Sequence, residues 1–61
     1  MDYRRILAAI RERLGLTRTE LAARIGVATI TIERWEKGSS KPHPVFERKI
    51  AELTKEAGMI G

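Results

Sequence analysis

The sequence contains no cysteine, a single histidine and only three aromatic residues, one each of Trp, Tyr and Phe. Without cysteine, neither a disulfide framework nor a thiolate metal site can support the fold, and the reducing cytoplasm is the natural compartment. One histidine supplies too few ligands for a metal site built from imidazoles. We therefore expect a cytoplasmic protein that uses no metal and no other cofactor.

Long hydrophobic runs are also missing. No stretch approaches the roughly 18 apolar residues that a membrane span needs, and Arg4, Arg5 and Arg11 interrupt the apolar core that a signal peptide would require. Paired carboxylates, a glycine-rich phosphate loop and a nucleophile near a base are absent at any recognisable spacing. The sequence therefore indicates no enzyme, no membrane contact and no small-molecule ligand.

The sequence does have an excess of positive charge, because 12 Lys and Arg residues stand against 8 Asp and Glu residues, for a net charge of +4. This excess favours a polyanionic partner, although charge alone does not identify a nucleic acid. The 61 residues are predicted to form a single domain, residues 1–61, and a domain of this size buries only about 60% of its unfolded surface. We expect marginal stability, for which dimerisation is a natural support.

Apolar residues at helical spacing predict four helices, over residues 3–14, 18–25, 29–37 and 44–57. Asp2 is the candidate N-cap of the first helix, and Pro44 lies in the first turn of the last. Glycines follow the first three helices, and Gly58 is predicted to end the fourth. The expected core positions of the two outer helices are Tyr3, Ile6 or Leu7, Ile10, Leu14, Phe46, Ile50, Leu53 and Ala57. The fold class is therefore all-α, a compact four-helix domain.

The two central helices are short and follow one another closely. Thr17 and Glu20 stand at the spacing of a capping box, and Gly26 lies where a helix ends in a left-handed residue. Two helices of under ten residues joined by so tight a turn must cross steeply and depend on the rest of the chain for their core. This pattern predicts a helix-turn-helix, a unit typical of DNA-binding proteins.

A recognition helix in the major groove presents its N-terminal residues to the base edges. On this basis the candidate base-contacting residues are Thr29, Ile30, Glu33 and Arg34. Two alternatives stay open from the sequence: Ile30 could face the core, and Arg34 could be a surface cation paired with Glu33 or with the end of its own helix. For Glu33, an ion pair with Lys37 one turn later is the more ordinary interpretation.

Phosphate contacts are expected from the start of the second helix and from the acid-free stretch after the third. The candidates are Thr17, Arg18, Lys37, Ser39, Ser40, Lys41 and His43. A solvated arginine is the alternative for Arg18, and an exposed loop side chain is the alternative for His43. We interpret Trp35 as a core residue against the fourth helix and Pro42, because its spacing from Ile32 directs it inward.

With these residues in view, the chain resembles the XRE-type helix-turn-helix family of phage Cro and lambda-repressor-like proteins. The resemblance runs from about Ile6 to Leu53. It depends on Leu21-Ala22, Gly26-Val27, Thr31-Ile32, Trp35-Glu36 and Gly38 at their spacings. It implies a lambda repressor-like fold, base contacts at the positions of Thr29, Ile30 and Arg34, and a salt bridge between Arg11 and Glu36.

The sequence departs from the family pattern at two places. Arg18 replaces the usual Gln, which adds a full charge where family members touch the DNA backbone and should make binding more salt-sensitive. Residues 54–57 continue the helical pattern where the family has a Leu-Gly-Val break before a fifth helix. We expect a long fourth helix and no fifth, which leaves the family's mode of dimerisation open.

The resemblance and the residues together predict sequence-specific binding of double-stranded DNA by a transcriptional regulator, as a repressor acting as a homodimer on a palindromic operator. Met59, Ile60 and the exposed side of the fourth helix are the interface candidates, with a frayed tail as the alternative. A module of the same fold that binds proteins, such as an antitoxin, an adaptor or an anti-regulator, is the competing hypothesis.

Overall fold

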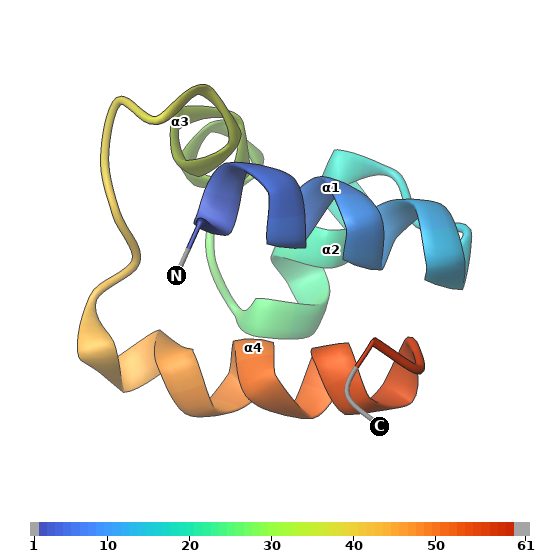
Figure 1. The fold of residues 1–61 in the computed structure, drawn as a ribbon. Helices are drawn as coiled ribbons and strands as arrows, with labels where there is room; N and C mark the ends of the chain where they lie inside the picture. The colour runs from blue at the N-terminus through green and yellow to red at the C-terminus, as the bar shows by residue number, and fades with distance from the viewer. Residues whose placement is uncertain (1, 60–61) are drawn as a thin grey trace.

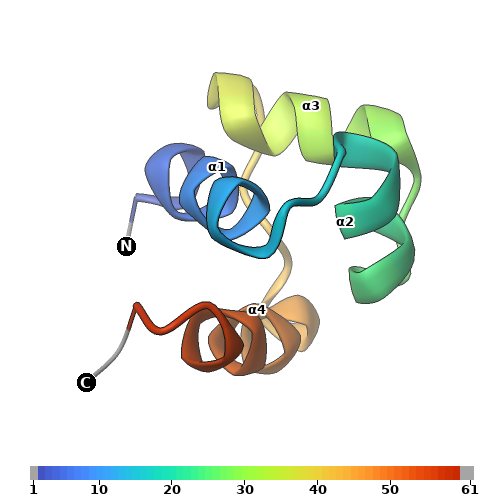
Figure 2. The same ribbon diagram turned by 90° about the vertical axis from the view of Figure 1, so that its right-hand side faces the viewer.

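The computed structural model describes residues 2–59, which form four helices: α1 (Tyr3–Leu14), α2 (Arg18–Ile25), α3 (Thr29–Lys37) and α4 (Pro44–Glu56). In Figure 1, α4 lies along one side of the molecule and the other three helices pack above it. Figure 2 shows the same arrangement from the side. The predicted all-α, four-helix fold is confirmed, and no fifth helix occurs within the described part of the chain.

The helices begin and end at local signals in the sequence. Asp2 caps α1, and its carboxylate accepts a hydrogen bond from the backbone N–H of Arg4 at 3.2 Å. The capping box of α2 is complete: Thr17 Oγ1 accepts from the N–H of Glu20, and the Glu20 carboxylate accepts from the N–H of Thr17. Each device satisfies N–H groups that the first turn of a helix leaves without backbone partners.

The α2–α3 turn requires a glycine, because Gly26 has a φ of +93° and residues with a side chain rarely adopt this region. The N–H of Gly26 donates to the carbonyl of Ala22 and so closes α2. At the other end of the chain, α4 ends at Glu56, one residue before the predicted end, with Ala57 as its C-cap.

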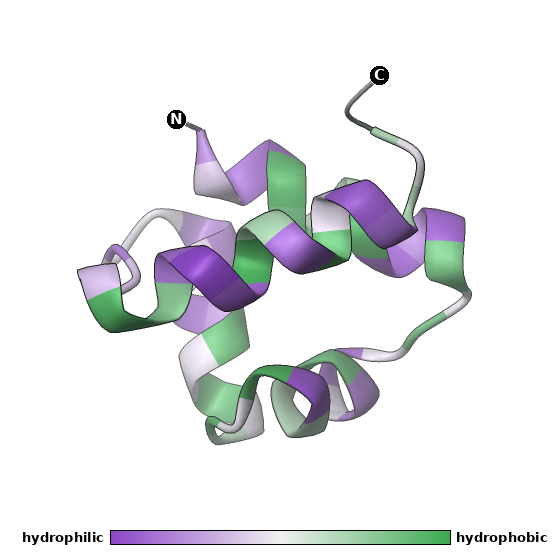
Figure 3. Ribbon diagram, turned by 90° about the horizontal axis from the view of Figure 1, so that it is seen from below, coloured by the Kyte–Doolittle hydropathy of each residue, from purple (hydrophilic) through white to green (hydrophobic). Residues whose placement is uncertain are grey.

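The core lies where the inner faces of all four helices meet. Its largest fully buried side chains are Leu7 and Ile10 of α1, Leu21 of α2, Ile32 of α3 and Ile50 of α4. Figure 3 shows hydrophilic and hydrophobic residues alternating in short blocks along the helices, as amphipathic helices require. The α-carbon radius of gyration is 10.2 Å, close to the value of about 10.5 Å for a globular chain of this length.

Two features of the last two helices bear on the site. Trp35 of α3 is 3% exposed, its ring centroid lies 5.7 Å from that of Phe46 on α4, and Pro42 is buried, so the interpretation of Trp35 as a core residue is confirmed. Met59 packs against the core and is half-buried. Met59, one of the interface candidates, therefore covers part of the monomer's own core, and Ile60, the other candidate in the tail, lies outside the described residues.

No helix within residues 2–59 is both long enough and apolar enough to cross a membrane.

Candidate nucleic-acid interface

The outer face of α3 carries two of the predicted base-contacting side chains, Ile30 and Arg34. Ile30 is 50% exposed and Arg34 is exposed, one turn further along the same face. Ile32 and Trp35 are buried on the other side of the helix and fix its rotation. The alternative that Ile30 faces the core is therefore wrong.

Thr29 opens α3 and is tied to the preceding helix. Its hydroxyl donates a hydrogen bond to the hydroxyl of Thr19 on α2 at 3.3 Å. A hydroxyl oxygen has two acceptor lone pairs, so Thr29 keeps hydrogen-bonding capacity for a further partner. This bond connects the two helices of the helix-turn-helix at the end where α3 begins.

The charged residues of α3 do not pair among themselves. Within residues 2–59, no ion pair joins Glu33 to Lys37 or Arg34 to Glu33, so the two local pairings considered from the sequence are not formed. Lys37 and Arg34 are exposed and Glu33 is half-buried. The positive side chains of α3 therefore remain directed to the surroundings.

A single carboxylate joins three helices beside this face. Glu36 of α3 accepts hydrogen bonds from Arg11 of α1, at 2.7 and 3.0 Å, and from Arg18 of α2 at 3.1 Å. The Glu36 side chain is only 8% exposed, whereas that of Arg18 is 50% exposed. The Arg11–Glu36 salt bridge implied by the family resemblance is confirmed.

The second arginine was not expected there. The sequence predicts a phosphate contact or a solvated side chain for Arg18, and no local signal predicts its pairing with Glu36 across 18 positions of sequence. Burial by itself raises the pKa of Glu36, but the hydrogen bonds and positive charges of Arg11 and Arg18 outweigh it and hold the pKa below its ordinary value. Glu36 therefore stays ionised and keeps both guanidinium groups in place.

The remaining expected phosphate contacts follow α3. Ser39, Ser40 and Lys41 are exposed in the segment between α3 and α4, and the N–H of Ser39 donates to the carbonyl of Arg34 at 2.9 Å. Thr17 lies at the start of α2, where its hydroxyl is used in the capping box. Exposed polar groups therefore follow the C-terminus of α3 and also stand at the start of α2.

His43 has a local role in the fold beyond the predicted phosphate contact. It is the N-cap of α4, and its Nδ1 accepts a hydrogen bond from the backbone N–H of Val45 at 3.1 Å. The position immediately before Pro44 was the available signal, because proline favours the first turn of a helix and its preceding residue is then the cap. The imidazole remains exposed, and within residues 2–59 only its Nδ1 takes part in a hydrogen bond.

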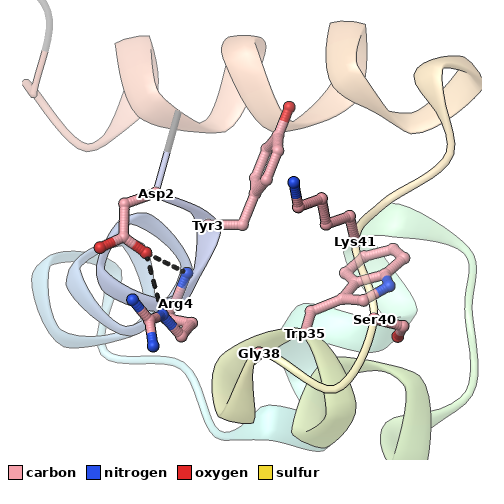
Figure 4. Close-up of a pocket in the computed structure, with 7 residues that line it drawn as sticks. All are labelled: Asp2, Tyr3, Arg4, Trp35, Gly38, Ser40 and Lys41. Atoms are coloured by element: carbon pink, nitrogen blue, oxygen red, sulfur yellow. Dashed lines mark hydrogen bonds and ion pairs between the residues drawn. The ribbon is translucent and has the colours of Figure 1, made fainter.

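An open cavity of about 500 Å³ lies between the start of α1, the end of α3 and the following segment. Figure 4 shows Lys41 extending over Trp35 toward Tyr3, while Arg4 turns back toward Asp2. Burial, followed by the nearby Glu47 carboxylate, raises the pKa of Tyr3, so its hydroxyl is neutral at physiological pH. No group of three or more His, Asp or Glu side chains able to hold a metal occurs in the described part of the chain.

Comparison with known proteins agrees with this geometry. A family model described as helix-turn-helix matches residues 7–56. The chain is also similar to an uncharacterised HTH-type transcriptional regulator of Methanothermobacter thermautotrophicus, with 42% identity over 48 residues that make up 79% of this chain and 70% of the relative. No solved structure gives a significant match. The chain belongs to the XRE-type helix-turn-helix family.

Proposed function

We propose that this DNA-binding transcriptional regulator reads a specific double-stranded sequence with α3 in the major groove and acts as a repressor. The observation that carries the proposal is the exposure of Ile30 and Arg34 one turn apart on α3, while Ile32 and Trp35 anchor the same helix in the core. A hydrophobic residue and a cation side by side on an exposed helix suit the edges of base pairs. Occlusion of a promoter is the simplest mechanism for so small a domain.

Each side chain on this face has a distinct role in the proposal. Ile30 packs on a thymine methyl group, and Arg34 donates to O6 and N7 of a guanine. Thr29 supplies a hydroxyl at the start of the helix, and Glu33 accepts from a cytosine amino group at the margin of the interface. The exposure of Ile30 supports this role, because covering an exposed apolar side chain with a thymine methyl group removes apolar surface from water, which favours binding.

The phosphate contacts position the helix without reading sequence. Arg18 extends from the start of α2 with half of its side chain exposed, and Glu36 fixes its direction. The other proposed phosphate contacts are the N-terminal turn at Thr17 together with Lys37, Ser39, Ser40, Lys41 and His43.

We further propose that two copies bind a palindrome. One nine-residue recognition helix reads only a few base pairs, and a two-fold dimer would place a second copy about 34 Å away, one turn of DNA along. The proposed interface is the exposed side of α4, where Val45 is 68% exposed. Met59 and Ile60, which follow the end of α4 in the sequence, are proposed to extend it.

Selection of bound duplexes from a randomised DNA pool at near-physiological salt, followed by sequencing, tests this proposal. An enriched inverted repeat with half-sites about one helical turn apart is the expected result. A single enriched half-site would retain DNA reading and overturn the dimer. A folded protein that enriches nothing would overturn sequence-specific binding and favour a protein-interaction module of the same fold.

A further inference from the structure

A second, smaller cavity of about 380 Å³ lies between α1 and α3, beside the proposed base-reading face. It is lined by four cationic side chains and two acidic ones, together with one alanine: Arg4, Arg11, Arg18, Lys37, Glu33, Glu36 and Ala8. The excess of cations makes this cleft suited to an anion. Most of its cations come from α1 and α2, although the base-reading residues are all on α3.

The acidic residues of the cleft do not cancel this excess. Glu36 is 8% exposed and its carboxylate is covered by Arg11 and Arg18, so it orients two guanidinium groups and presents little negative charge of its own. Glu33 is half-buried, and together with Glu36 it balances only two of the four cationic side chains, so the cleft keeps a net positive charge. An anion entering the cleft therefore meets guanidinium groups that are already held in place.

Arg4 is the member of the cleft whose position is least expected from the sequence. Its stem lies across the end of α3, because a Cβ atom built on Gly38 would be 2.9 Å from Arg4 Cδ. Its Nε donates to Asp2 at 3.3 Å, and 62% of its side chain is exposed. A guanidinium has five N–H donors, and within residues 2–59 the structure gives the Arg4 guanidinium only the Nε bond to Asp2, so its terminal N–H groups can meet another partner.

The dimensions of DNA place phosphates at this cleft. A helix with its side chains is about 10–12 Å across, and the major groove is about 12 Å wide, so the sugar-phosphate chains lie directly against the flanks of a recognition helix. Glu33 and Lys37 occupy the flank of α3 that borders the cleft, while Ile30 and Arg34 lie on its outer face. A backbone phosphate beside α3 therefore meets the cleft.

We propose that this cleft binds a DNA backbone phosphate and that Arg4 contacts it directly, which extends the DNA footprint onto α1. The inference rests on the proposed function, since the ligand is the phosphate of the duplex that α3 reads. Arg4 supplies charge and N–H donors, and Gly38 is the residue that lets its stem cross the end of α3. Arg11 and Arg18 complete the cationic wall.

Arg5 provides a matched control, because it is the next residue, carries the same charge and pairs with the same Asp2, yet is 91% exposed and does not line the cleft. We would compare Arg4→Gln with Arg5→Gln, measuring affinity for the selected duplex over a range of salt concentrations. Each lost phosphate contact flattens the slope of log affinity against log salt by about 0.9, which corresponds to about a fivefold loss at 0.15 M salt. Arg4→Gln should show this change, and Arg5→Gln should show neither.

A second measurement locates the phosphate. Replacing single phosphates of the duplex by uncharged methylphosphonates should reveal one position whose replacement weakens binding by wild-type protein more than it weakens binding by Arg4→Gln, while the other positions affect the two proteins alike. Glutamine keeps a stem that can lie on Gly38, and circular dichroism would verify the fold of both variants. If Arg4→Gln and Arg5→Gln behave alike while wild type binds the duplex, the inference is overturned and the proposed function stands. Wild-type protein with no salt-dependent affinity would overturn both.

Discussion

At the scale of single residues, Ile30 and Ile32 show how rotation around one helix separates contact with DNA from contact with the core. They are two positions apart on α3, which turns them about 200° from one another. Ile30 is 50% exposed, whereas Ile32 is fully buried. We therefore expect substitution of Ile30 to affect DNA binding and substitution of Ile32 to affect the stability of the fold.

Replacing Ile30 by Ala should weaken binding to the selected duplex by about 1–2 kcal/mol, because it removes three carbons worth about 0.8 kcal/mol each when fully buried, and only the exposed half of Ile30 can be newly covered by DNA. The free energy of unfolding should change by less than about 0.5 kcal/mol, as is usual for a surface position. Titration calorimetry and thermal unfolding measure the two quantities. Ile32→Ala is the matched control, expected to cost about 2–5 kcal/mol of stability. A wild-type affinity combined with a lower melting temperature in Ile30→Ala would contradict the assignment.

At the scale of the helices, the four N-termini differ in how well they are capped. Asp2, Thr17 and His43 each accept a hydrogen bond at the start of a helix, but the N-cap of α3 is Ala28, which has no side-chain acceptor. Ala28 already has the extended conformation of an N-cap, with φ −74° and ψ 152°. The helix proposed to read DNA therefore has the weakest start of the four.

Replacing Ala28 by Ser should raise the free energy of unfolding by about 1 kcal/mol, because serine caps a helix and alanine does not. For a domain of this size the melting temperature should rise by about 4–8 °C, measured by circular dichroism without DNA. Thr17→Ala, which removes an existing cap from α2, should shift it downward by a similar amount. An unchanged or lower melting temperature for Ala28→Ser would contradict the expectation that a missing N-cap hydrogen bond limits the stability of α3.

At the scale of the whole molecule, ion pairs connect helices that lie far apart in the sequence. Glu36 joins α3 to α1 and α2 through Arg11 and Arg18, and Arg24 of α2 binds Glu56 at the end of α4 at 2.6 Å. The Glu36 carboxylate is nearly covered, whereas both partners of the second pair are about half exposed. The first cluster should therefore contribute more to stability than the second.

Acid should weaken the fold through Glu36. Because its pKa is lowered on folding, the stabilisation is complete above the ordinary value of 4.5 and is lost as the pH falls toward the folded value. Glu36→Gln should lower the free energy of unfolding by about 1–3 kcal/mol at pH 7, since it weakens hydrogen bonds to charged groups. Urea unfolding should show this deficit shrinking below pH 4.5. Glu56→Gln should have a smaller effect, and a deficit for Glu36→Gln that is constant with pH would contradict the linkage.

The sequence by itself determined the helices, because their signals act over a few residues. The capping box at Thr17, the turn at Gly26 and the position of Pro44 each involve groups two to four residues apart, and the period of apolar side chains fixed the inward faces of Ile32 and Trp35. The apolar period that directs Ile32 and Trp35 inward also directs Ile30 outward, although burial of Ile30 remained an alternative from the sequence.

Apart from the Arg11–Glu36 bridge that the family resemblance implied, only the tertiary structure decided the pairing of charges between helices and the shape of the surface. Arg18 meets Glu36 from 18 positions away, Arg4 crosses the end of α3 at Gly38, and Met59 folds back onto the core. A long flexible side chain carries no periodic signal of its own, since its partner depends on where the packed helices cross. The core fixes those crossings, and the cleft between α1 and α3 exists only once they are fixed.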